Sequence, residues 1–240
     1  AGDLLLYPYG YTNNAPTIEN DLFEGISEEL VSQNGFNNIL SSDLYPAAGD
    51  SDDFMYGTVG THDKIYAMTP EIGSSFWPPS SQIESIAKGM MYLNLTAAKM
   101  ANNYASVKDT TPMFVGDQAT VNCTFDIKRL GVSGSGNFTV SINPISSNIT
   151  AVGNPVSFNN LEVLEQDEGT IQYTIAFGAE AGDDIEYELV INNGSYDNIV
   201  FIGKKFGSLL PIFEDPGDSV TDNFENNGWG TTSSTFVSPS

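Results

Sequence analysis

The sequence predicts an α/β region of about one hundred residues, followed by an antiparallel β-sandwich. Two observations lead to this fold class. Before residue 105, apolar residues recur at helical spacing, whereas residues 113–212 hold short alternating runs separated by Gly, Asn and Asp. Turn signals recur in this second part at intervals of about 10 to 15 residues, which is typical of antiparallel sheets with one polar face.

The α/β region opens with a short apolar run, Leu4–Tyr7, which predicts a buried strand. Tyr66–Met68 is a second, shorter strand candidate. Residues 20–36 place apolar side chains on one helical face, and residues 81–104 repeat them at helical spacing over a longer stretch. We therefore expect one helix in each of these two stretches.

The second part has the alternation expected of an immunoglobulin-like or fibronectin-type-III-like sandwich. Cys123 alternates with apolar neighbours in one of its runs, so we expect a small core residue there. The expected strands are residues 119–127, 137–145, 169–177, 183–191 and 197–203. Residues 1–105 would thus form the first domain, 106–112 a linker, 113–212 the sandwich, and 213–240 a linker with the start of a further β domain.

Charge limits the partners. The chain has 31 acidic and 8 basic residues, a net charge of −23, which argues against binding to nucleic acid or to an anionic membrane. Such a balance suits a salty or extracellular medium, and a preference for cationic partners or Ca²⁺ is the alternative. No apolar run approaches the roughly 18 residues of a membrane span.

Four motifs follow one another in the first hundred residues: "LLLYPYGYT" (4–12), "LYPAAGDSDDFMYG" (44–57), "YAMTPEIG" (66–73) and "FWPPSSQI" (76–83). In this order they resemble the C-terminal half of the catalytic domain of M14 (funnelin, carboxypeptidase A/B) zinc carboxypeptidases. The resemblance spans about residues 3–100. Because the chain starts abruptly within this pattern, we expect it to be a segment of a longer polypeptide.

The resemblance implies a role for several residues. Glu71 would be the general base that takes a proton from zinc-bound water and returns it to the leaving amine. Tyr45, with Leu44 beside it, would bind the substrate, Tyr45 by closing over its C-terminal end. Asp52 would lie at the base of the specificity pocket and select C-terminal Lys or Arg, as in the carboxypeptidase B branch. Phe54 stands where the family has Trp, which we expect to change packing only.

The resemblance also implies zinc, but this chain lacks the family's ligands. The family binds zinc through the His and Glu of an H-x-x-E motif and a later His, and this chain has no such motif and one histidine, His62. We interpret His62 as a loop residue. We therefore expect the segment alone to be inactive, with zinc bound in the parent protein and the missing half of the peptidase domain as a partner. Ca²⁺ in the acidic turns is a further possibility.

The leading hypothesis is a secreted or cell-surface bacterial zinc carboxypeptidase that acts on peptide or protein C-termini. The main alternative is a non-catalytic binding or adhesion module on a degenerate carboxypeptidase fold. A generic acidic structural protein is the third reading, and it leaves the four ordered motifs unexplained. Joint retention of Glu71, Tyr45 and Asp52 favours the enzyme, because an adhesive scaffold has no use for a base beside a pocket carboxylate.

Overall fold

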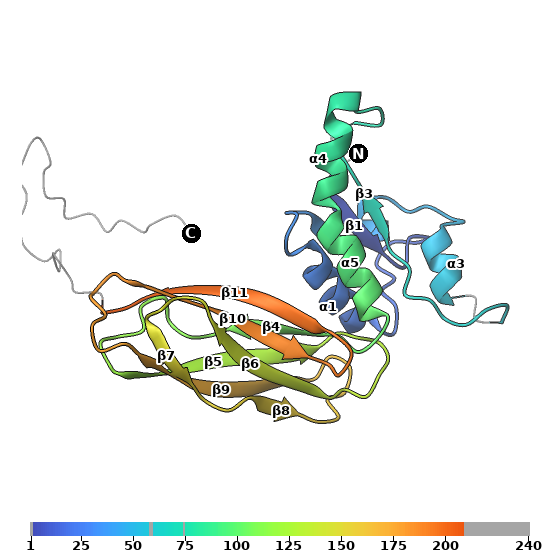
Figure 1. Ribbon diagram of the computed structural model, residues 1–240. Coiled ribbons are helices and arrows are strands. Elements are labelled where there is room, and N and C mark those ends of the chain that lie inside the picture. The colour runs from blue at the N-terminus through green and yellow to red at the C-terminus, as the bar shows by residue number, and fades with distance from the viewer. Residues whose placement is uncertain (1, 58–59, 74, 209–240) are drawn as a thin grey trace, which may run out of the picture.

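The computed structural model describes residues 2–57, 60–73 and 75–208. This part of the chain is mostly sheet, with three separate sheets and few helices. Figure 1 shows two bodies that touch, here called the first region (residues 2–104) and the two-sheet region (residues 105–208). None of the helices described has the length and apolarity that a membrane span requires.

The first region contains a three-stranded sheet in the order β2-β1-β3, with β1 parallel to β2 and antiparallel to β3. Leu5 and Tyr7 point to one side of β1, where Leu5 packs with α1 and α5 and Tyr7 stacks on Phe23. Leu6 points to the opposite side, as strand alternation requires. The elements are β1 Leu4–Tyr7, α1 Asn20–Val31, β2 Asn37–Leu40, α2 Ser41–Leu44, α3 Ser51–Gly57, β3 Thr69–Glu71, η1 Ser80–Gln82, α4 Ile83–Gly89 and α5 Met91–Met100.

The structure confirms some of the expected elements and corrects others. Leu4–Tyr7 is a strand, and α1 fills the first part of the helix expected over residues 20–36. The strand predicted at Tyr66–Met68 is wrong, because pairing with β1 begins only at Thr69. The single helix expected over residues 81–104 is divided into η1, α4 and α5, with an interruption at Met90 next to the poor helix former Gly89.

The two-sheet region contains the expected antiparallel sheets, in the orders β4-β5-β9-β7 and β11-β10-β6-β8. Their buried faces share one core that includes Cys123, Phe125, Tyr173 and Tyr187, and Cys123 is fully buried as expected. Each of the five predicted segments overlaps a strand, although four of these strands extend beyond the predicted bounds. The strands are β4 Ala105–Asp109, β5 Thr120–Arg129, β6 Phe138–Pro144, β7 Ile149–Val152, β8 Val156–Phe158, β9 Gln166–Ile175, β10 Asp184–Asn192 and β11 Asp197–Lys205.

The junction of the two regions differs from the expected linker. Most of residues 106–112 is ordered, since β4 pairs with β5 over Ala105–Asp109. Beyond the strands, Leu130 and Leu164 of the two-sheet region pack into the same apolar cluster as α1 and α5. The two regions therefore share buried surface. The expected final segment, residues 213–240, lies outside the described residues.

Candidate functional site

Glu71 is the last residue of β3. Its register partner on β1 is Leu4, and its side chain is partly buried. The strand pairing thus fixes the backbone of Glu71 at the end of β3.

A cavity of about 290 Å³ lies beside Glu71. It contains three of the four site residues predicted from the sequence: Glu71, Tyr45 and Leu44. The loop from α2 to α3 and the ends of β1 and β3 therefore meet around one space. The lining is Leu6, Gly10, Ser41, Leu44, Tyr45, Ala47, Ala48, Gly49, Asp50, Thr69 and Glu71.

Tyr45 directly follows the short helix α2 in an extended conformation. Its side chain is 65% exposed, and Leu44 beside it is 41% exposed. An exposed tyrosine at the rim of a cavity has both the freedom to move and a hydroxyl group that can donate a hydrogen bond. These are the properties that contact with a substrate terminus would require.

Asp52, the fourth predicted residue, lies deeper than expected. It is 4% exposed and accepts a hydrogen bond from Thr69, and it is not one of the residues that line the cavity. Its Oδ2 atom has no hydrogen-bond partner among the described residues. Burial raises the pKa of Asp52 above its ordinary value; the bond from Thr69 opposes this, and the nearby charge of Asp50 adds to it.

Asp53 fixes the segment that carries these groups. Its two carboxylate oxygens accept hydrogen bonds from the backbone amides of Gly10 at 2.8 Å and Tyr11 at 2.9 Å. The start of α3 is thereby tied to the end of β1. Phe54, next in sequence, is 47% exposed and lies edge-on to the ring of His62, with 4.9 Å between the ring centroids.

A second cavity, of about 350 Å³, lies on another side of Glu71. Its lining is mostly apolar, whereas that of the first cavity mixes polar and apolar residues, and Glu71 lines both. Phe76, one of its lining residues, is 84% exposed. The lining residues are Pro70, Glu71, Ile72, Ser75, Phe76, Pro78 and Ile86.

The residues that the structure describes do not fit a zinc site. Within the described ranges no group of three or more His, Cys, Asp or Glu side chains could hold a metal ion. His62, the one histidine of the chain, lies in a loop with its Nδ1 atom 2.8 Å from the carbonyl oxygen of Asp63. Any zinc used together with Glu71 must therefore be bound by other residues.

Sequence reasoning missed three polar residues of the cavity: Ser41, Asp50 and Thr69. Thr69 and Asp50 lie within the quoted motifs, two residues before Glu71 and Asp52 respectively, and this spacing was the available signal. Asp50 lines the cavity and Asp52 does not. This difference depends on the turn at Gly49, where φ is +85°.

A family model described as Peptidase_M14, zinc carboxypeptidase, matches residues 1–93. This stretch carries Glu71, Tyr45, Leu44 and Asp52. Residues 1–93 are therefore a zinc carboxypeptidase-like region, and the family that they resemble is zinc-dependent in general. No match was found among curated proteins.

Several solved structures match the chain at low identity. A conjugative transposon lipoprotein from Bacteroides eggerthii is 16% identical, with 42% of this chain and 95% of that chain covered and a TM-score of 0.31. A FixG-related protein from Vibrio parahaemolyticus is 10% identical, with coverages of 45% and 97% and a TM-score of 0.30. A chain of the CsuC–CsuE chaperone–tip adhesion subunit complex from Acinetobacter baumannii is 11% identical, with coverages of 43% and 56% and a TM-score of 0.26. At these scores the similarities carry no argument about function.

Proposed function

We propose that the first region is the part of a zinc carboxypeptidase that holds the general base and the specificity cavity. The observation that carries this proposal is the meeting of Glu71, Tyr45 and Leu44 around one cavity. Glu71 accepts a proton from the attacking water and returns it to the leaving amine. The hydroxyl group of Tyr45 donates a hydrogen bond to the substrate's C-terminal end.

The substrate in this proposal is a peptide or protein whose C-terminal residue is Lys or Arg. Asp52 supports this preference, because its buried carboxylate has an oxygen without a partner among the described residues. A cationic side chain would compensate this charge, whereas a neutral one would leave it unpaired. The cost of leaving this buried charge unpaired would therefore select against substrates with a neutral C-terminal side chain.

The zinc ligands lie outside this chain in our proposal. They would come from the rest of the peptidase domain, which would also cover the open strands β2 and β3 at the edges of the three-stranded sheet. The isolated 240-residue chain would then hydrolyse no peptide. We further propose a secreted or cell-surface bacterial location. The two-sheet region would be an accessory domain with an immunoglobulin-like or fibronectin-type-III-like fold, and Ca²⁺ would bind to its turns.

The test compares the isolated chain with the longest natural polypeptide that contains it. With stoichiometric zinc, the longer polypeptide should release arginine from a peptide ending in Ala-Arg, and the isolated chain should release none. Glu71→Gln should lower kcat about 10²- to 10⁴-fold, the usual contribution of a general base. Glu84→Gln, on exposed α4, is the matched control and should leave kcat unchanged.

Two results would contradict the proposal. Turnover by the isolated chain would show that the catalytic site is complete without other residues. A longer polypeptide that binds a peptide ending in arginine but never cleaves it, with or without Glu71, would identify a binding module in place of an enzyme.

A further inference from the structure

The cavity beside Glu71 contains a carboxylate that the sequence motifs do not assign to the substrate. Asp50 lines this cavity together with Tyr45 and Glu71, whereas Asp52 does not. Asp50 is partly buried, and Asp52 is 4% exposed. Of the three aspartates in the motif, Asp50, Asp52 and Asp53, only Asp50 therefore lines the cavity, which it shares with the carboxylate of Glu71.

The local structure holds Asp50 in this position. Gly49 turns the chain with φ at +85°, and Asp50 Oδ1 accepts a hydrogen bond from the backbone amide of Asp52 at 3.2 Å. On the other side lies Gly10, where an added Cβ atom would come within 3.1 Å of Asp50 Oδ2. The absence of a side chain at Gly10 thus lets the Asp50 carboxylate lie against the end of β1. Asp50 is thus a part of the cavity wall that a backbone hydrogen bond orients.

The negative charge at this wall is not compensated. The ion pairs between described residues involve none of Asp50, Asp52 and Asp53. Asp53 is satisfied by two backbone amides, but Asp52 Oδ2 is buried without a described partner. Thr69 lines the cavity and bonds to Asp52, so the second carboxylate lies directly behind the lining. Two uncompensated carboxylates close together favour a cation between or before them.

We propose that Asp50 is the residue that contacts the cationic side chain of the substrate, with Asp52 supporting it from behind Thr69, and that the cavity prefers arginine to lysine. This rests on the proposed function. A guanidinium group is planar and weakly hydrated, and its five N–H donors can serve two carboxylates at once. The ammonium group of lysine is compact, strongly hydrated and has three donors.

The proposal can be tested on the chain as it stands, without zinc or turnover. Amide chemical shifts of the 240-residue chain would be followed during titration with L-arginine, L-lysine and neutral L-citrulline. Asp50→Asn should weaken arginine binding at least about 10-fold, since a hydrogen bond between charged groups is lost. Asp52→Asn should weaken it less. Asp43→Asn is the matched control, because this nearby acidic residue is exposed and does not line the cavity; it should change the affinity less than about twofold.

Each outcome decides between the inference and the proposed function. Equal arginine affinity in Asp50→Asn and Asp43→Asn, or no arginine binding by the wild-type chain, would overturn the inference. If Asp52→Asn alone abolishes binding, Asp52 is the contact residue, and the inference fails while the proposed function stands. Lysine binding as tight as arginine binding would refute the stated preference. Failure of the proposed function is read separately, from turnover and from Glu71→Gln in the longer polypeptide.

Discussion

The carboxylate of Glu19 accepts a hydrogen bond from the hydroxyl group of Tyr56, at 2.8 Å, and this bond joins the start of α1 to α3. The hydroxyl group of Tyr66 binds the same carboxylate at 2.8 Å, and the ammonium group of Lys64 forms an ion pair with it. Figure 1 shows α1, α3 and the chain leading to β3 as separate segments of the first region. Glu19 is therefore the common acceptor that connects the elements around the candidate site.

Glu19→Gln should lower the free energy of unfolding by about 1–2 kcal/mol, because three donors lose a charged acceptor that is only partly exposed. Urea denaturation followed by circular dichroism would measure this. Glu84→Gln is the control, since its ion pair with Lys88 is highly exposed, and it should cost less than about 0.5 kcal/mol. Equal losses in the two variants would contradict the assigned role of Glu19.

Acid should remove the advantage of Glu19. Burial alone would raise the pKa of Glu19, but hydrogen bonds from Lys64, Tyr66 and Tyr56 hold it below its ordinary value of 4.5. A carboxyl whose pKa is lower in the folded state stabilises the fold above its unfolded pKa, and this stabilisation is lost as the pH falls through the folded pKa. The stability difference between wild type and Glu19→Gln should thus be full at pH 7 and shrink below about pH 4.5. A difference that stays constant down to pH 3 would refute the linkage.

Gly169→Ala should destabilise the two-sheet region. The ring of Phe125 lies over Gly169, and an added Cβ atom would come within 2.3 Å of it. Overpacking of this kind costs about 1–3 kcal/mol. Gly178→Ala, where a Cβ atom meets nothing within 4 Å, is the matched control and should change the thermal midpoint little. If Phe125→Leu does not relieve part of the loss in Gly169→Ala, the assigned clash is wrong.

Leu130→Ala should weaken both regions together. Leu130 is 2% exposed, belongs to the two-sheet region by sequence, and packs into the cluster that contains α1 and α5. Removal of a buried Leu side chain costs about 2–5 kcal/mol. Hydrogen exchange should accelerate in α1 as well as in β9, whereas Val152→Ala at an exposed site of β7 should change neither. Acceleration confined to β9 would show that the two regions unfold independently.

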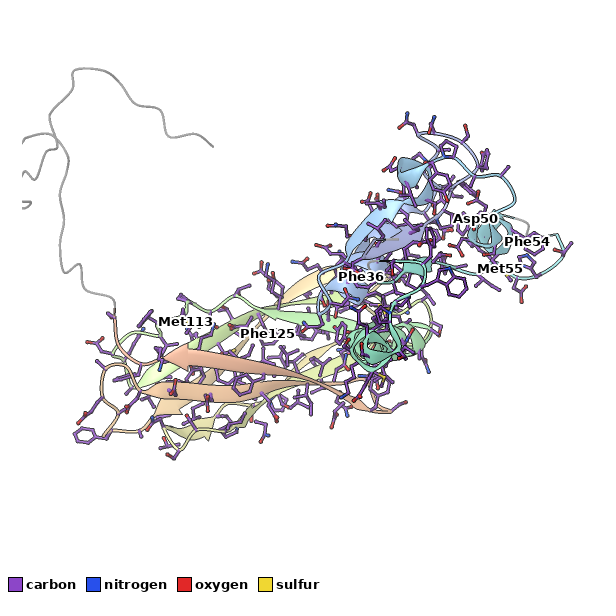
Figure 2. The ribbon with its side chains drawn as sticks, turned by 90° about the horizontal axis from the view of Figure 1, so that it is seen from above. Phe36, Asp50, Phe54, Met55, Met113 and Phe125 are labelled. Atoms are coloured by element: carbon purple, nitrogen blue, oxygen red, sulfur yellow. The ribbon has the colours of Figure 1, made fainter. Side chains whose placement is uncertain are left out.

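Much of the two-sheet region could be predicted from the sequence, because a strand with one buried face records its burial as alternation. Cys123 and Phe125 alternate with polar neighbours and are fully buried. Strands such as β8, with three residues, and β7, with four, were missed because they are too short to show this alternation. The side chains drawn in Figure 2 show Phe125 within the strands and Met113 near their far end, in the connection between β4 and β5. Phe114, next in sequence, forms an isolated bridge with Lys205 of β11 in the other sheet.

The candidate site could likewise be predicted from the sequence only in part. Glu71, Tyr45 and Leu44 were predicted from motifs, and all three line one cavity. Only the tertiary structure decided how the three aspartates, Asp50, Asp52 and Asp53, lie relative to this cavity. The turn at Gly49 and the close approach of Gly10 place Asp50 in the wall of the cavity. Thr69 covers Asp52, and backbone amides after β1 donate hydrogen bonds to Asp53. Figure 2 places Asp50 beside Phe54 and Met55 in the first region, far from the two-sheet core.

By itself, the sequence determined the strand alternation, the helical faces and the set of candidate groups, because these follow from the order of residue types along the chain. These properties are local, because each depends on neighbours within a few positions of the chain. Tertiary structure alone decided that Leu130 and Leu164 complete the core of the first region, and that Asp50 rather than Asp52 faces the cavity beside Glu71. Such contacts join residues far apart in the chain or depend on one backbone turn, and no period in the sequence records them.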